Sequence, residues 1–280
     1  MKVALLEASH WHVPLYLDAL EAPGIEVVAV SDAEQAKGEA IAARFGSRLN
    51  SSANELLDRE EVDFAFVFGR HSEMPALAQA VIARNIPFAL EKPCGVNMSQ
   101  VTWLRTLTEE ANLYCAVPLI FRMSELLGSL EEAEGRIPSN FNYMSFRFVA
   151  GPPSRYEAAG SGWVIDPVYS GGGSTINLAT HFIDLFSLLT GKEVAPVSAV
   201  MNSRTHGGAV EDYSLVTMQT EDGVMGVVET DTAFPVPPTS SAIFFHSSFG
   251  PHVREVWSGP NRDPRQEQSF RPHAQPPRSA

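Results

Sequence analysis

Cysteine is scarce in this sequence, with only Cys94 and Cys115 among its 280 residues. Two thiols cannot form a disulfide framework, and such usage is typical of a reducing compartment. Long hydrophobic runs are missing too, because no stretch reaches the roughly 18 apolar residues that a membrane-spanning helix needs. The first residues, Met1–Leu6, form a strand-like run without a secretory signal. We therefore expect a cytoplasmic protein with no membrane partner.

Positive charge is also in short supply. Only 20 Lys and Arg residues stand against 33 Asp and Glu residues, which gives a formal net charge of −13. An acidic chain repels phosphate backbones, so we expect no nucleic-acid partner. Apolar residues make up 44% of the chain and charged residues 19%, as is typical of globular proteins. The length is sufficient for two domains.

The N-terminal part of the chain, residues 1–119, alternates short apolar runs with helical patterns. The predicted strands are Lys2–Leu6, Glu26–Val30, Phe64–Phe68, Phe88–Leu90 and Tyr114–Val117, and the predicted helices are Pro14–Leu20, Ala33–Phe45, Pro75–Arg84 and Ser99–Ala111. Continuous apolar strands that alternate with helices indicate a parallel sheet that is buried on both faces. The fold class predicted here is α/β, with a doubly wound parallel sheet.

A different pattern follows in residues 120–250, where strand candidates alternate apolar and polar residues. Phe141–Val149 and Tyr213–Gln219 have this alternation, which is typical of antiparallel strands with one solvated face. Asp222-Gly223 between two such runs predicts a hairpin. We therefore expect an α+β second domain with a mainly antiparallel sheet, followed by an extended or disordered tail, Pro251–Ala280.

The loop after the first strand is the first candidate site. Ligands of doubly wound folds bind at the carboxyl ends of the strands, and dinucleotide folds ordinarily show Gly-x-Gly-x-x-Gly there. Here all three glycines are missing. We nevertheless assign the loop to a cofactor pyrophosphate, through Ala8, Ser9, His10, Trp11 and His12. Two alternatives stay open: the pair His10 and His12 binds a metal ion, or these residues are ordinary loop packing.

The next strand ends carry further cofactor candidates. Ser31 and Asp32 follow the second strand, where a carboxylate accepts hydrogen bonds from the adenosine ribose and disfavours a 2′-phosphate. This placement predicts NAD in preference to NADP. The alternative role of Asp32 is to cap the helix predicted from Ala33. Gly69 and His71, after the third strand, are also assigned to the cofactor.

Glu91-Lys92-Pro93 follows the fourth strand. Proline disfavours helical geometry at Lys92 and therefore holds it extended at the end of the strand. A lysine ammonium there can hydrogen-bond a substrate hydroxyl and favour the alkoxide as hydride leaves the same carbon. We assign Lys92 to catalysis and, with Glu91, to the cofactor; the alternative is a surface lysine before a turn.

A polar stripe marks a helix expected to begin after Gly171-Gly172-Gly173, with Ser174 as N-cap, and to end before Gly191. Asn177, His181 and Asp184 lie at i, i+4 and i+7 of an otherwise apolar helix. Buried polar groups cost roughly 1–3 kcal/mol each when they lack a partner. A substrate is one such partner, and a structural hydrogen bond is the other.

These features together resemble the Gfo/Idh/MocA family, the glucose-fructose oxidoreductase and inositol dehydrogenase group. The resemblance covers about Lys2–Phe245 and rests on four segments, Val28–Asp32, Glu61–Asp63, Glu91–Pro93 and Gly171–Gly173 followed by His181. It implies a Rossmann domain, a C-terminal domain whose open sheet forms a homo-oligomer (dimer or tetramer), and hydride exchange between NAD(P) and a sugar, polyol or related carbonyl.

Residue roles also follow from the resemblance. Lys92 is similar to the family lysine that contacts substrate and cofactor, and His181 to its proton-transferring histidine. Asn177 stands where many members have Asp, so it lacks the charge that would orient His181, and Asp184 is the candidate substitute. Asn177, Asp184, Arg122 and Trp163 are assigned to the substrate. The alternatives are a nucleotide or sugar sensor without efficient catalysis and a metal-dependent hydrolase that uses His10 and His12.

Overall fold

The computed structural model describes residues 1–124, 127–128, 130–131, 140–232, 242–249 and 252–258. The chain divides into two compact units. Unit 1 consists of Met1–Pro118 and Tyr156–Ile176, and unit 2 of Leu119–Arg155 and Asn177–Ala280. The segment Tyr156–Ile176 therefore follows the first strand of unit 2 in the chain but packs within unit 1.

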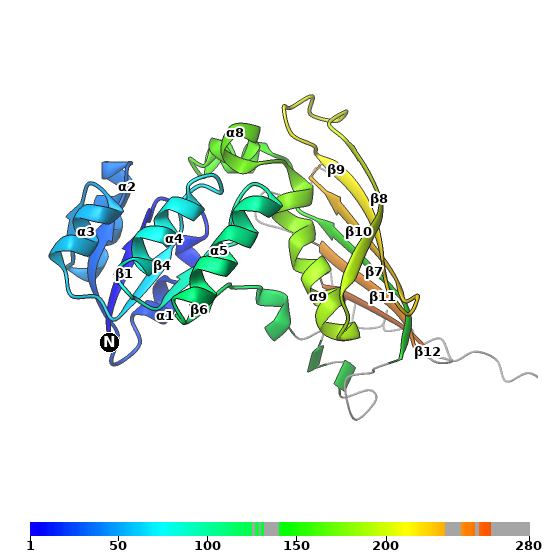
Figure 1. Ribbon diagram of the computed structural model, residues 1–280. Helices are drawn as coiled ribbons and strands as arrows, with labels where there is room; N and C mark the ends of the chain where they lie inside the picture. The colour runs from blue at the N-terminus through cyan, green and yellow to red at the C-terminus, as the bar shows by residue number, and fades with distance from the viewer. Residues whose placement is uncertain (125–126, 129, 132–139, 233–241, 250–251, 259–280) are drawn as a thin grey trace, which may run out of the picture. The chain divides into compact units, whose positions relative to one another are not determined.

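Unit 1 contains a six-stranded sheet whose strands are all parallel, in the order β3-β2-β1-β4-β5-β6 (Figure 1). The strands are β1 (Lys2–Leu6), β2 (Glu26–Ser31), β3 (Arg48–Asn50), β4 (Phe64–Val67), β5 (Phe88–Leu90) and β6 (Cys115–Ala116). The helices are α1 (Leu17–Leu20), α2 (Gln35–Phe45), α3 (Ala53–Arg59), α4 (Met74–Ile82) and α5 (Met98–Glu110), with a 3₁₀ turn η1 (Val13–Leu15). The predicted doubly wound sheet is confirmed.

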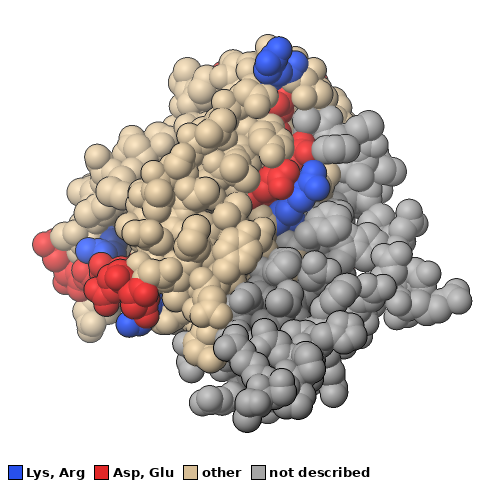
Figure 2. Space-filling view, turned by 90° about the vertical axis from the view of Figure 1, so that its right-hand side faces the viewer, with Lys and Arg blue, Asp and Glu red and all other residues tan. Residues whose placement is uncertain are grey.

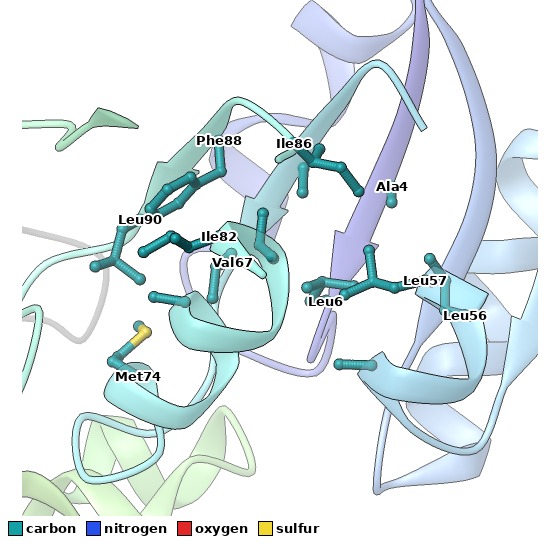
Figure 3. Packing of buried hydrophobic residues seen from close by; sticks show 14 of the residues in the cluster. Ala4, Leu6, Leu56, Leu57, Val67, Met74, Ile82, Ile86, Phe88 and Leu90 are labelled. Carbon is teal, nitrogen blue, oxygen red and sulfur yellow. The ribbon is translucent and has the colours of Figure 1, made fainter. Parts of the chain in front are cut away.

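The sheet of unit 1 is buried on both faces, as its continuous apolar strands predicted. Figure 3 shows one of its two cores, in which Leu56 and Leu57 of α3 and Met74 of α4 pack against strand residues such as Leu6 and Val67. The sequence analysis missed β3 and α3, which are three and seven residues long. The Ser52 side chain caps α3 by accepting a 3.3 Å hydrogen bond from the Glu55 amide.

Unit 2 is built on a mixed six-stranded sheet with the order β12-β11-β7-β10-β9-β8. Its strands are β7 (Phe141–Val149), β8 (Val194–Asn202), β9 (Tyr213–Thr220), β10 (Met225–Asp231), β11 (Ala242–Phe249) and β12 (His252–Ser258). Only β7 and β10 pair in parallel; the other neighbours are antiparallel. The predicted mainly antiparallel sheet is confirmed.

The predicted hairpin joins β9 to β10. Gly223 has φ +93°, a conformation that favours glycine. Strand β12 lies in the segment predicted as an extended or disordered tail, Pro251–Ala280, and residues 259–280 of that segment lie outside the described residues.

One helix of unit 2, α9 (Thr180–Thr190), covers one face of this sheet (Figure 1). Phe182, Leu185 and Phe186 are its buried contacts. At Gly226 of β10 a Cβ atom would lie 2.8 Å from Cε2 of Phe186, so only glycine allows this close approach. The helix ends at Gly191, as predicted, with φ +64°.

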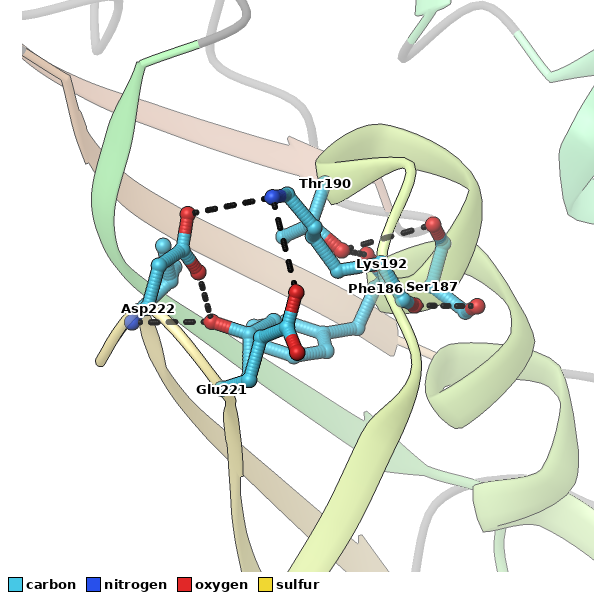
Figure 4. Close-up of polar contacts among 8 residues, drawn as sticks. Phe186, Ser187, Thr190, Lys192, Glu221 and Asp222 are labelled. Atoms are coloured by element: carbon cyan, nitrogen blue, oxygen red, sulfur yellow. Dashed lines mark hydrogen bonds and ion pairs between the residues drawn. The ribbon is translucent and has the colours of Figure 1, made fainter.

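Polar contacts fix the end of α9 to the β9–β10 turn, as Figure 4 shows. The Ser187 hydroxyl donates a 3.0 Å hydrogen bond to the carbonyl oxygen of Lys192. The Lys192 ammonium in turn lies 3.9 Å from a Glu221 carboxylate oxygen and 3.7 Å from Asp222 Oδ2. Apolar packing and these contacts therefore both hold α9 on the sheet.

Shorter helices complete the described structure. Unit 2 has the 3₁₀ helix η2 (Ile120–Met123), and unit 1 has η3 (Gly162–Ile165) and α8 (Pro167–Ser170). The helix α7 (Ser154–Ala158) and the π-helical turn η4 (Thr175–Ala179) each span a boundary between the units.

Candidate active site

Glu91 is the centre of a buried hydrogen-bonded cluster at the carboxyl end of β5. Its Oε2 accepts a 2.7 Å bond from the Tyr16 hydroxyl, and its Oε1 lies 3.0 Å from His12 Nδ1 and 3.0 Å from the Lys92 amide nitrogen. Burial raises the pKa of this carboxyl, but the hydrogen bond and charge of His12 and the charge of Lys92 outweigh it and lower the pKa to about 2. The carboxylate is therefore charged at neutral pH.

Lys92 lies next to this carboxylate and is 4% exposed. The Lys92–Pro93 peptide bond is cis. Such burial does not fit the alternative of a surface lysine before a turn. A buried ammonium requires anionic or polar partners, and the neighbouring Glu91 charge is one of them.

The first loop has one residue in the backbone conformation that favours glycine. Glu7, which stands at the first glycine position, has φ +57°. The amides that follow it bond within unit 1: those of Ala8 and His10 donate to the carbonyl oxygens of Ser31 and Glu7, at 3.2 and 3.3 Å. The loop is thus held by its own residues and by the end of β2.

Asp32 joins this loop to the segment after β2. It is fully buried; its Oδ2 accepts a hydrogen bond from the Ser9 amide, and its Oδ1 a 2.6 Å bond from the Glu34 amide. Burial raises its pKa. Helix α2 begins at Gln35 and not at Ala33, so Asp32 precedes the N-cap position, which Glu34 occupies. Both oxygens already have a backbone donor.

Aromatic rings from three segments meet beside Glu91. The His10 ring lies 6.2 Å from Phe68, 5.1 Å from His12 and 5.4 Å from Trp163, measured between ring centroids. Trp163, on η3, also meets His71 edge-on at 4.9 Å. Trp163 was assigned to the substrate, and the structure places it with the assigned cofactor residues His10 and His71.

His71 lies after β4 and is buried. Its Nδ1 is 2.9 Å from the carbonyl oxygen of Ser170, to which it donates. Burial lowers the pKa of His71 to about 4, so the ring is neutral at pH 7. Gly69, two residues earlier, lies so close to α4 that a Cβ atom there would meet Cδ1 of Leu77, whose side chain would have to move.

The glycine run, Gly171–Gly173, has a steric reason at its first residue. Gly171 has φ +77°, and a Cβ atom there would lie 2.6 Å from Cβ of Val96. The run therefore passes directly against the loop that follows Pro93. Sequence reasoning missed Tyr16, because a tyrosine on a short helical segment carries no motif that points to Glu91.

Asn177 and His181 lie in unit 2, on η4 and on the first turn of α9. They are 3% and 5% exposed, and the His181 ring meets Phe121 of η2 edge-on at 5.0 Å. The π-helical turn at Asn177 was not predicted; such turns occur often at functional sites. The helix therefore holds both polar side chains in an otherwise apolar setting.

Asp184, the third residue of the predicted stripe, binds Arg122. Arg122 Nε lies 2.8 Å from Asp184 Oδ2, and Arg122 Nη2 also contacts Asp184 Oδ1. The two residues were assigned separately to the substrate, and the structure pairs them with each other. Asp184 is 16% exposed and Arg122 50% exposed at the side chain.

Within the described residues, no group of three or more His, Cys, Asp and Glu side chains is arranged to hold a metal ion. His10 and His12 instead contact each other, since Nδ1 of His10 accepts a 3.1 Å hydrogen bond from the His12 amide. None of the described helices is long and apolar enough to span a bilayer.

Two protein-family models match the chain. Residues 9–118 match an oxidoreductase family with an NAD-binding Rossmann fold, and residues 142–246 match the GFO/IDH/MocA C-terminal domain. The rhizopine catabolism protein MocA of Rhizobium meliloti is 23% identical over 244 residues, which cover 85% of this chain and 74% of that protein.

Solved structures share the architecture. The WlbA dehydrogenase from Bordetella pertussis, in complex with NADH and UDP-GlcNAcA, has a TM-score of 0.79 at 20% identity and covers 92% of this chain and 74% of its own. For myo-inositol 2-dehydrogenase from Lactobacillus plantarum the TM-score is 0.77 at 15% identity. The match covers 91% of this chain and 76% of that enzyme's chain. At these identities the likeness shows the fold alone.

Proposed function

The chain belongs to the GFO/IDH/MocA family of oxidoreductases, and on this basis we propose that it transfers hydride between a nicotinamide cofactor and a hydroxyl or carbonyl group of a sugar, polyol or related compound. The observation that carries the proposal is Lys92, a lysine buried beside the Glu91 carboxylate at the carboxyl end of β5. Ligands of doubly wound sheets bind at that edge.

A dinucleotide fits the residues at this edge of unit 1. Nε2 of His10 is buried and has no hydrogen-bond partner among the described residues, which is the condition of a donor that awaits a ligand. Ser9, His10 and His12 would lie near the pyrophosphate, and Gly69, His71 and Lys92 toward the nicotinamide. When bound, the nicotinamide accepts or supplies the hydride.

We infer a preference for NAD over NADP from Asp32. Its two oxygens are occupied by the Ser9 and Glu34 amides, so its effect on a 2′-phosphate is the repulsion of its negative charge and not a hydrogen bond to the ribose. Titration calorimetry with NAD⁺ and NADP⁺ checks this, and tighter binding of NADP⁺ would contradict it.

Different side chains of this protein are assigned to charge stabilisation and to proton transfer. In the oxidation of an alcohol, Lys92 hydrogen-bonds the reacting oxygen and stabilises its negative charge as the C–H bond gives up hydride. Within unit 2, we assign acceptance of the hydroxyl proton to His181 and a hydrogen bond to the substrate to Asn177. Because Asn177 has no charge, His181 works without a carboxylate at that position.

The proposed substrate class and homo-oligomer have separate support. Two of the similar structures are a dehydrogenase in complex with NADH and UDP-GlcNAcA and a myo-inositol 2-dehydrogenase. For self-association, the face of the unit 2 sheet opposite α9 presents Val200, Leu215 and Val227, and the described surface in Figure 2 is mostly uncharged. Analytical ultracentrifugation tests for a dimer or tetramer.

Turnover with a panel of sugars and polyols tests the function, measured by the absorbance of the reduced nicotinamide. Lys92→Ala is expected to lower kcat by about 100-fold or more, because it removes the stabilisation of the developing charge. Lys2→Ala is the matched control, since Lys2 lies at the amino end of β1 and forms an exposed ion pair with Glu61. An unchanged kcat for Lys92→Ala would contradict the assigned role.

One observation favours a second candidate, a sensor that binds the nucleotide without efficient turnover. Amides of the first loop that a glycine loop presents to phosphate are bonded within unit 1. Sustained turnover with any member of the panel excludes the sensor. NADH binding without turnover across the panel would favour it.

A further inference from the structure

The first loop offers few backbone donors to an anion. A glycine-rich loop normally binds phosphate through its free amides and the helix start behind them. Here the amides of Ala8, Ser9, His10 and His12 bond to groups of unit 1 itself. The helix that follows is split into the three-residue η1 and the four-residue α1. A phosphate at this loop therefore needs another donor.

The side chain of His10 provides one. Because its Nδ1 accepts the hydrogen bond from the His12 amide, the neutral ring carries its proton on Nε2. His10 is 4% exposed, and Nε2 has no partner in the part of the chain that the structure describes. A buried N–H without an acceptor is unfavourable, and a ligand oxygen would satisfy it.

The surroundings of His10 hold the ring in place. Phe68, directly after β4, stacks on the imidazole with 29° between the ring planes, and the rings of His12 and Trp163 pack around it. Burial, and then the neighbouring His12, keep the pKa of His10 well below its usual range, so the ring is neutral at pH 7. The donor is therefore fixed in position, in one tautomer.

We propose that the Nε2–H of His10 donates a hydrogen bond to a pyrophosphate oxygen of the bound dinucleotide, in place of the loop amides of a glycine-rich loop. This inference rests on the proposed function and adds to it the atom of the first loop that binds the cofactor. Nε2 has almost no exposed surface, so binding shifts a neighbouring ring, and Trp163 is a half-buried one. Tryptophan fluorescence should change on binding.

Two amide substitutions separate the two ring nitrogens. The Oδ1 of Asn is as many bonds from Cβ as Nδ1 of His, so His10→Asn keeps the acceptor for the His12 amide. Its Nδ2 ends one bond short of the position of Nε2, so the donor at that position is lost. The Nε2 of Gln is as many bonds from Cβ as Nε2 of His, so His10→Gln restores the donor. We expect His10→Asn to weaken binding about 10- to 100-fold and His10→Gln to recover much of it.

The probes are NADH and ADP-ribose, which share the pyrophosphate while only NADH has the nicotinamide. Calorimetry should show His10→Asn weakening both equally. A loss confined to NADH would place the donor at the nicotinamide and overturn the inference, as would unchanged binding of both. His10→Phe, which keeps a ring against Phe68, repeats the test if His10→Asn does not fold. If the unchanged protein binds neither probe, the proposed function itself fails.

Discussion

The polar residues of the two units are held in opposite ways. In unit 1, His12 and Tyr16 both bind Glu91, which lies 75 positions after Tyr16 in the chain, so one carboxylate holds the first loop. In unit 2, Asn177 and His181 lie on η4 and α9. The buried side chains Phe182, Leu185 and Phe186, called here the apolar face of α9, hold α9 on the sheet. Unit 1 should therefore respond to changes of charge, and unit 2 to changes of volume.

The largest expected effect is in unit 2. Phe186 is fully buried between α9 and β10, and its Phe186→Ala variant leaves a cavity beside Gly226. We expect the free energy of unfolding to fall by about 3–5 kcal/mol, measured by urea denaturation. Leu188→Ala on the same helix is the control, because Leu188 is 42% exposed and should change stability little. Equal losses of unfolding free energy for both variants would show that the apolar face of α9 does not hold the helix on the sheet.

The next largest effect is expected in unit 1, whose free energy of unfolding should fall in acid. The folded state holds the pKa of His71 at about 4, against 6.5 for a free histidine, so the unfolded chain binds more protons between these values. This stabilisation is complete above pH 6.5 and is lost as the pH falls toward 4, by about 3 kcal/mol. Glu91, with a pKa of about 2, loses its own contribution only below about pH 4.5.

The measurement is urea denaturation at several pH values, followed by near-ultraviolet circular dichroism. Three of the four tryptophans, Trp11, Trp103 and Trp163, belong to unit 1 and report on it. His71→Gln should flatten the slope between pH 6.5 and 4. His206→Gln changes an exposed histidine of unit 2 and should leave the slope as it was. The reverse result would show that the acid response does not come from the buried cluster.

Much of the fold could be predicted because it depends on local patterns. The boundaries of β1, β5 and β7 match their apolar runs, and Asp222-Gly223 marked the hairpin. The short elements β3 and α3 escaped because three and seven residues are too few for a periodic signal. Apolar periodicity therefore predicts a strand or helix wherever the element is long enough to show the repeat.

The candidate site was less predictable, because its contacts join residues that are far apart in the chain. Tyr16 and Glu91 are separated by 75 positions, and Arg122 and Asp184 by 62. The missing glycines were plain from the sequence. Their consequence was not, since Glu7 takes φ +57° and the amides of Ala8 and His10 bond to carbonyl oxygens of Ser31 and Glu7.

The smallest expected effect concerns Asp184 and sharpens the comparison most directly. If unit 2 had a charge network like that of unit 1, Asp184 would act on His181. Its two oxygens instead bind Arg122, which is half exposed and therefore screened by solvent. We expect Asp184→Asn to lower the free energy of unfolding by less than about 1 kcal/mol and to leave the pH profile of turnover unchanged. Leu188→Ala again controls for a change on the same helix. A shifted pH profile of turnover at unchanged stability would show that Asp184 acts on His181 and would contradict this expectation.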